Sequence, residues 1–163
     1  MGFKDWLASK SLAKGRANIS TTLAKLIPLA DASWERTERC ILAEYWPLPG
    51  VDPAVHALQE KLLKDLMLWK GDVPDKEAVE LIVAGLARAG AGAKMAVRHV
   101  VITEWHRLGK PTVSQAEMEK ILGSREEDKK LNERVRVYAL HHLALEQAVK
   151  DVTGKKPERP TYH

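Results

Sequence analysis

The chain has 163 residues, of which 45% are hydrophobic and 29% are charged, and its formal net charge at pH 7 is +4. This composition is that of a soluble globular domain with one core, and it argues against long disordered segments. The single cysteine excludes an internal disulfide, and no run of about 18 apolar residues is present to span a membrane, so we expect a cytoplasmic protein.

The positive charge is concentrated at the two ends of the chain. Residues 1–25 contain five basic residues and one acidic residue, and residues 155–163 contain three basic residues and one acidic residue. The body between them, residues 26–154, has 18 basic and 20 acidic residues. A slightly acidic body therefore carries two basic ends, where we expect any contact with an anionic partner.

The first predicted element is a basic N-terminal arm or helix over residues 1–18. It combines Phe3, Trp6 and Leu7 with several cations, a pattern typical of a segment that contacts a partner. A targeting segment and a helix lying on an anionic membrane surface are the alternatives. Two lysines fall near the face of Phe3, so peripheral membrane contact is not expected. The residues predicted to bind a partner are Lys4, Trp6, Lys10, Lys14, Arg16 and, beyond the arm, Trp46.

Start and stop signals divide the chain into eight helical segments. Asp52 and Pro53 have the residue types of an N-cap and a first helical position. Ser114 and Ser124 each stand three residues before a glutamate, which is the spacing of a capping box. Pro28 is expected to separate or kink the second and third segments. The predicted helices cover residues 3–13, 19–27, 31–46, 53–70, 74–89, 93–108, 113–122 and 125–153.

Apolar spacing indicates which faces of these helices are buried. At about 100° per residue, one stripe of the helix over 53–70 contains Val55, Leu58, Leu62, Leu66 and Trp69. A similar stripe near the helix over 31–46 contains Ala30, Trp34, Thr37, Ile41 and Tyr45. Cys40 lies inside this helix, where a buried and unreactive thiol is typical. Both stripes predict packing against a common core.

The glycine-rich segment 85–94 matches neither common nucleotide-binding motif. A phosphate loop needs Lys and then Ser or Thr after its second glycine, and a dinucleotide fingerprint needs a third small residue where Met95 stands. We therefore interpret the segment as a connection in which small residues allow close backbone approach.

The segment 97–105 would suit a strand as well as a helix, because it is rich in β-branched residues. On a helical wheel, Glu104 falls on the apolar side of this segment. A buried carboxylate must be paired or is held for chemistry. Pairing with Arg107 or Arg98, or exposure at the rim, is the structural alternative to a catalytic role.

The order of elements over residues 110–136 is a short helix, a glycine turn and a longer helix, which suggests helix-turn-helix geometry. Three acids, Glu126, Glu127 and Asp128, open the second helix and oppose docking against phosphate. Nucleic-acid binding is therefore kept as an alternative, either here or through the basic ends.

The last predicted helix, 125–153, has two apolar faces. One face has heptad spacing and contains Leu131, Val135, Tyr138, His142, Leu145, Val149 and Val152. The second contains Val137, Leu140, Ala144 and Ala148. A helix that is apolar on two sides is usually central to a bundle. We therefore predict an all-α, compact bundle of about seven or eight helices with a long central C-terminal helix. Since no second heptad run of this strength is present, a long self-associating coiled coil is not expected.

His142 lies within the heptad face, and Glu146 follows one turn later. The pair could support acid–base chemistry or metal binding, whereas the structural alternative is a hydrogen-bonded core or interface histidine. Together with Glu104 they form the candidate polar core site. No Glu-x-x-His motif, His-Glu-x-x-His motif or serine nucleophile elbow is present, so no metal or cofactor is expected.

The sequence predicts a non-enzymatic helical module that binds a macromolecule. Its arrangement would be an N-terminal arm over residues 1–18, one helical domain over 19–154 and a loose basic tail over 155–163. A protein partner or a homo-oligomer is the leading expectation, because no catalytic constellation is found. A helix-turn-helix nucleic-acid binder is the first alternative, and an enzyme or metalloprotein built around His142 and Glu146 is the second.

Overall fold

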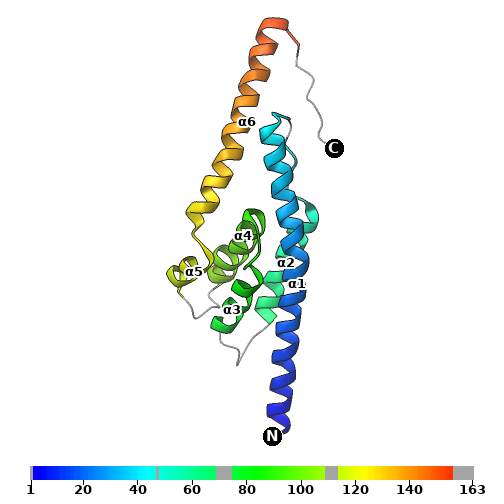
Figure 1. Cartoon of the computed structure of the whole chain (residues 1–163), viewed down its shortest axis with the longest axis vertical. Helices are drawn as coiled ribbons and strands as arrows, with labels where there is room; N and C mark the ends of the chain where they lie inside the picture. Colours follow the sequence, from blue (N-terminus) through cyan, green and yellow to red (C-terminus); the bar gives the residue numbers. More distant parts are fainter. Residues whose placement is uncertain (1, 47, 69–74, 109–113, 156–163) are drawn as a thin grey trace.

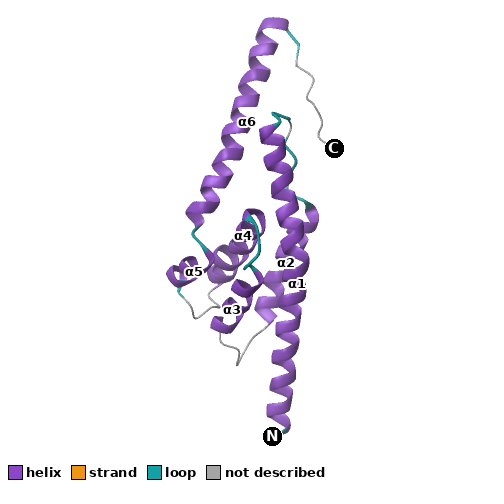
Figure 2. Ribbon diagram, viewed as in Figure 1, coloured by secondary structure: helices purple, strands orange, loops and turns teal. Residues whose placement is uncertain are grey.

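The computed structural model describes residues 2–46, 48–68, 75–108 and 114–155. Its α-helices are α1 (Phe3–Leu42), α2 (Pro53–Leu68), α3 (Asp75–Gly85), α4 (Ala91–Arg98), α5 (Gln115–Leu122) and α6 (Arg125–Thr153). Helix α4 continues into a π-helix, η1 (His99–Trp105), and a 3-10 turn, η2 (His106–Leu108). The described ranges contain no strand, as Figure 2 shows, so the all-α prediction is confirmed. The predicted count of seven or eight helices is wrong, because the described residues form six α-helices.

Helix α1 explains the lower count, because it joins three predicted helices into one of 40 residues. It passes through Pro28, which lacks the amide hydrogen that an unbroken helix would use. Leu26 and Ala30, on either side of the proline, are buried in the core. Packing along α1 therefore outweighs the local cost of the proline, and the predicted break does not form.

The core lies between the middle of α1 and helices α2, α3, α4 and η1. Its most deeply buried side chains are Ile19, Leu26, Leu62, Ile82, Val97, Val100, Val101 and Met118. The predicted stripe of α2 is confirmed, since Val55 and Leu66 are buried as well and Leu58 is half-buried. Its last member, Trp69, lies outside the described residues.

Helices α1 and α4 are held together by a close contact at Gly92. A Cβ at this position would lie closer than 3.0 Å to the carbonyl oxygen of Ala30 and to Cβ of Trp34. Next to Ala30, the carboxylate of Asp31 accepts hydrogen bonds from the amides of Gly90, at 2.9 Å, and Ala93, at 2.8 Å. An aspartate of α1 thus caps α4, and the prediction of close backbone approach in the glycine-rich segment is confirmed.

Local signals set the ends of the other helices. Asp52 Oδ1 accepts a hydrogen bond from the amide of Ala54 at 2.9 Å, at the start of α2. Ser114 Oγ accepts one from the amide of Glu117 at 3.2 Å, at the start of α5. The box predicted at Ser124 does not form, because this side chain makes no capping hydrogen bond.

The segment 97–105 is helical, so the strand alternative is wrong. Residues Val100, Val101, Ile102 and Trp105 of η1 are buried. A π-helix has a wider turn than an α-helix, and this changes which side chains face the core. Glu104, which the α-helical wheel placed with the core residues, keeps 31% of its side chain exposed.

Helix α6 is not central to the bundle, in contrast to the prediction. None of its described residues is buried. Figure 1 shows that it leaves the body near α5 and runs beside the C-terminal end of α1 before extending beyond it. The two apolar faces predicted that other helices surround α6. Only the face with Tyr138 and His142 contacts the end of α1. Among the described residues, no helix has both the length and the apolar character needed to cross a membrane.

Candidate binding surfaces

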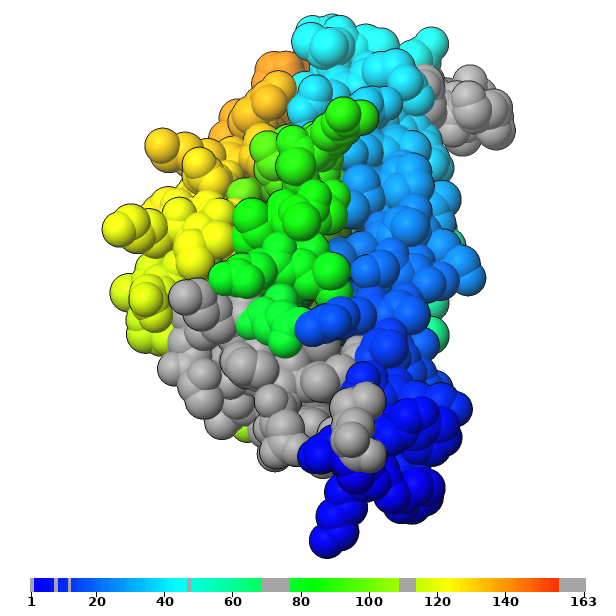
Figure 3. All heavy atoms as spheres, turned by 60° about the horizontal axis from the view of Figure 1, so that its bottom comes forward, coloured from blue at the N-terminus to red at the C-terminus, as the bar shows by residue number. Residues whose placement is uncertain are grey.

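The N-terminal part of α1 projects from the body, as Figures 1 and 3 show. The described side chains from Phe3 to Asn18 include no buried one, and Ile19 is the first of the described residues to be buried. Phe3 is 73% exposed, and Trp6 is 44% exposed. Their rings stack with centroids 6.0 Å apart, and Lys10 Nζ lies 4.2 Å from the centroid of a Trp6 ring. The arm therefore presents an aromatic pair with an adjacent cation.

The remaining cations of the arm fall into two groups. Lys4 and Lys14 are exposed. Arg16 instead forms an ion pair with Glu77 of α3, so it ties the base of the arm to the body. Such an exposed ion pair contributes little to stability, but it shows where the arm meets the fold.

Trp46 joins the end of α1 to the middle of α6. Its ring stacks on the imidazole of His142, with centroids 5.7 Å apart and planes 5° from parallel. Tyr138 packs against the same imidazole at 4.3 Å. The Tyr138 hydroxyl lies 2.7 Å from the carbonyl oxygen of Tyr45 and 3.2 Å from that of Cys40, either of which can accept its hydrogen bond. His142 and Trp46 thus belong to a joint between helices.

The candidate polar core residues are placed in different surroundings. Glu104 lies 3.2 Å from Arg107 Nη2, as the pairing alternative predicted, and 3.8 Å from His99 Nε2. His142 belongs to the joint, and Glu146 is half-buried one turn further along α6. Across the described part of the chain, no group of histidine, cysteine, aspartate or glutamate side chains could hold a metal ion.

The joint contains two groups whose ionisation is suppressed. Burial raises the pKa of the Cys40 thiol above its ordinary value, as expected of a buried and unreactive thiol. Burial, and to a lesser degree the carboxylate of Glu44, raises the pKa of Tyr138 above 10.0. Both groups are neutral when protonated. Their contribution to stability is therefore complete below the pKa values of the unfolded chain and is lost as the pH rises through the higher folded values.

Removing the Tyr138 hydroxyl is expected to reduce this alkaline sensitivity. Tyr138→Phe should cost about 1 kcal/mol at neutral pH, because one hydrogen bond to a carbonyl is lost. The difference in tyrosinate absorbance between wild type and variant, followed during an alkaline titration, should have its midpoint above 10.0. A midpoint at or below that value would contradict the described joint.

A buried arginine anchors the base of α6 to α4, and the sequence did not identify it. Arg98 is 4% exposed. Its Nε donates to Asp128 Oδ1 at 3.0 Å, its Nη2 binds the same oxygen, and its Nη1 donates to the carbonyl oxygen of Leu122 at 3.3 Å. Glu127 Oε2 lies 3.3 Å from Nη1. Two of the three acids at the start of α6, Glu127 and Asp128, therefore have a buried partner.

A second buried polar contact joins α1 to α2. Asp65 is 5% exposed, and it accepts hydrogen bonds from the Thr22 hydroxyl at 2.6 Å and from Lys61 Nζ at 2.8 Å. The sequence signal for this contact is the position of Asp65, an acidic residue next to the apolar stripe of α2. Its role is to fix two helices, because both of its oxygens are engaged within the fold.

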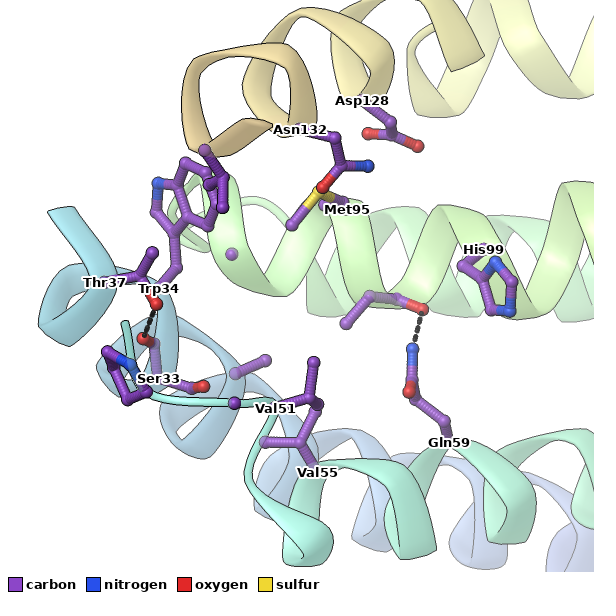
Figure 4. Close-up of a pocket in the computed structure, with 16 residues that line it drawn as sticks. Ser33, Trp34, Thr37, Val51, Val55, Gln59, Met95, His99, Asp128 and Asn132 are labelled. Atoms are coloured by element: carbon purple, nitrogen blue, oxygen red, sulfur yellow. Dashed lines mark hydrogen bonds between the residues drawn. The ribbon is translucent and has the colours of Figure 1, made fainter. Parts of the chain in front are cut away.

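A cavity of about 410 Å³ separates the first turns of α6 from the body. Figure 4 shows Trp34 of α1, Val55 of α2 and Met95 of α4 on its apolar walls, with Asp128 and Asn132 of α6 opposite. Arg98 already binds Asp128, and the Gln59 amide donates to the carbonyl oxygen of Ala96 at 3.0 Å. Two polar residues of the lining, Asp128 and Gln59, are therefore engaged within the scaffold.

Comparison of the chain with protein-family models, with curated proteins and with solved structures finds no match.

Proposed function

We propose that the protein is a non-enzymatic module that binds another protein through its N-terminal arm. The observation that carries this proposal is the exposed Phe3–Trp6 pair on a helix whose described side chains are not buried before Ile19. Large aromatic side chains dominate binding energy when a partner covers them. Their exposure on the free chain is unfavourable, and a partner would remove it.

The charges of the arm define the partner's chemistry. Trp6, Lys10 and Lys14 follow one another at intervals of four residues, so they lie along one face of α1. Residues 1–18 contain four basic residues and one acidic residue. An acidic surface with an apolar pocket would complement both the aromatic tip and the row of lysines.

Protein is favoured over nucleic acid because of how few cations the arm offers. Arg16 is already paired with Glu77, which leaves Lys4, Lys10 and Lys14 for a partner. Phosphate contacts from so few cations would give only weak binding at physiological salt. The aromatic pair, in contrast, gains most from an apolar pocket that excludes water.

Truncating Trp6 is expected to remove partner capture without affecting the fold. Full-length protein is immobilised through its C-terminus and exposed to nuclease-treated lysate of the cells that produce it. Trp6→Ala should weaken capture about 30-fold, the effect of losing one interfacial hot spot. Lys14→Glu should weaken it about tenfold through charge reversal.

Ser9→Ala is the matched control, because Ser9 is exposed on the same helix and lies outside the row formed by Trp6, Lys10 and Lys14. All three variants should unfold at the wild-type urea concentration. Capture of the same proteins by wild type and Trp6→Ala would overturn the proposal. Capture that depends on intact nucleic acid would also overturn it, in favour of a nucleic-acid partner.

A further inference from the structure

We infer that the open face of α6 binds the same face of a second copy of this chain, with the two helices antiparallel. This face, the α6 stripe, contains Lys130, Glu133, Val137, Leu140, Ala144, Gln147 and Asp151. The inference goes beyond the proposed function of the arm, and it rests on different residues.

The α6 stripe has the spacing of a helix-packing seam. Its members are separated alternately by three and four residues, which places them on one side of the helix. All of them are exposed. Val137 is 57% exposed and Leu140 is 54% exposed, so the apolar middle of the stripe is in contact with solvent.

The contacts with α1 leave this stripe open. Tyr138 and His142 face the end of α1, where they contact Trp46 and two backbone carbonyl groups. At about 100° per residue, Leu140 and Ala144 lie on the opposite side of α6 from these two side chains. A groove of about 590 Å³, lined by Lys130, Glu133 and Val137 of the stripe, separates α6 from Ile41 of α1. The face that contains Tyr138 and His142 is therefore covered at these two residues, although Leu145 and Val149 further along it are exposed, whereas every member of the stripe is exposed.

The order of charges along the stripe selects a second copy as the occupant. Lys130 stands at its N-terminal end and Asp151 at its C-terminal end, with the apolar residues between them. In an antiparallel pair, the lysine end of each stripe meets the aspartate end of the other, so the surface is complementary to itself. A parallel pair would align lysine with lysine and aspartate with aspartate.

The residue sizes in the middle also suit this arrangement. Ala144 follows Leu140 one turn later, and a small residue allows a neighbouring helix to approach closely. With Lys130 opposite Asp151, Val137 of one copy meets Ala144 of the other, and the two Leu140 side chains meet at the centre. The contact is isologous, so both copies are covered and the assembly closes as a dimer.

Sedimentation velocity over a wide range of concentrations tests the inference. The wild type should shift from one chain to two as concentration rises. Leu140→Glu should remain a monomer throughout, because it places two carboxylates in the apolar centre. Lys130→Asp should weaken the dimer about tenfold or more, because it brings like charges together at both ends.

Lys130→Asp alone distinguishes the two orientations, because in a parallel pair it would only exchange one like-charge contact for another. Lys130→Asp combined with Asp151→Lys should restore wild-type association in an antiparallel pair. Lys150→Asp is the control, since it makes the same charge change away from the stripe and should leave the dimer unaffected. Circular dichroism should show wild-type helix content for every variant, because each altered side chain is exposed.

Three results would overturn the inference: a monomer at all concentrations, a dimer unchanged by Lys130→Asp, or a stripe covered only when another protein is added. The arm provides an independent comparison. Leu140→Glu should still capture the arm's partner, and Trp6→Ala should still dimerise, so failure of either proposal can be recognised separately.

Discussion

Arg98→Ala is expected to lower the free energy of unfolding by about 3 kcal/mol, the largest effect that we expect from losing one polar side chain. The substitution leaves Asp128, whose side chain is 16% exposed, without its charged partner. It also removes the donor to the carbonyl oxygen of Leu122. Removing one partner of a buried ion pair costs more free energy than an exposed ion pair contributes. The reason is that the remaining charge stays desolvated.

Urea unfolding followed by circular dichroism measures this loss. Arg107→Ala is the matched control, because Arg107 makes an exposed pair with Glu104 and should change stability by no more than about 0.5 kcal/mol. Arg98→Lys should recover only part of the loss, since an ammonium group cannot reproduce the forked contacts. A loss below about 1 kcal/mol for Arg98→Ala would contradict the anchoring role.

Gly92→Ala is expected to destabilise the protein by about 3 kcal/mol, although helix propensity alone would favour alanine by about 1 kcal/mol. The new Cβ would meet the backbone of Ala30 and Cβ of Trp34 closer than 3.0 Å. Neither atom belongs to a flexible side-chain end, so α1 and α4 would have to separate. The steric clash therefore outweighs the gain in helix propensity, and the net effect on stability is a loss.

Gly50→Ala provides the comparison for Gly92, because a Cβ at Gly50 would have no atom within 4 Å. The midpoint of urea unfolding should be nearly unchanged for Gly50→Ala and clearly lower for Gly92→Ala. If Gly92→Ala unfolded at or above the wild-type midpoint, the close contact between α1 and α4 would be wrong.

Much of the secondary structure could be predicted because its signals are local. Asp52 and Ser114 act as N-caps within a few residues of their own helices. Gly154 ends α6 in the left-handed conformation, with φ at 71°. Such features depend on neighbours in the sequence, and a single sequence contains all of them.

The features that could not be predicted depend on partners far away in the chain. Pro28 predicts a break in the helix when only its neighbours in the sequence are considered. The packing that keeps α1 intact is contributed by α2 and α4, which are distant in the sequence. Asp31 caps α4 from 59 residues away, and Arg98 binds Asp128 across 30 residues. Periodicity indicates that a residue lies on a packed face of its helix, but it does not identify the residues that pack against this face.

The candidate surfaces show the same division. The charge of the arm and its aromatic residues are visible in the sequence, whereas the engagement of Arg16 by Glu77 is not. For α6, the apolar spacing indicates both apolar faces, but the prediction that other helices cover both of them is wrong. An uncovered face in one chain and a covered face in an assembly have the same sequence pattern.

Photo-cross-linking from the arm tests the central claim, capture of a protein partner, most directly. A benzophenone amino acid replaces Leu7, which is 46% exposed beside Trp6, in the cells that produce the protein. The same amino acid at Ser9, about 160° around α1 from Leu7, is the control. We expect irradiation to link position 7, and not position 9, to another polypeptide. Absence of a product at position 7, or equal products at both positions, would contradict the account.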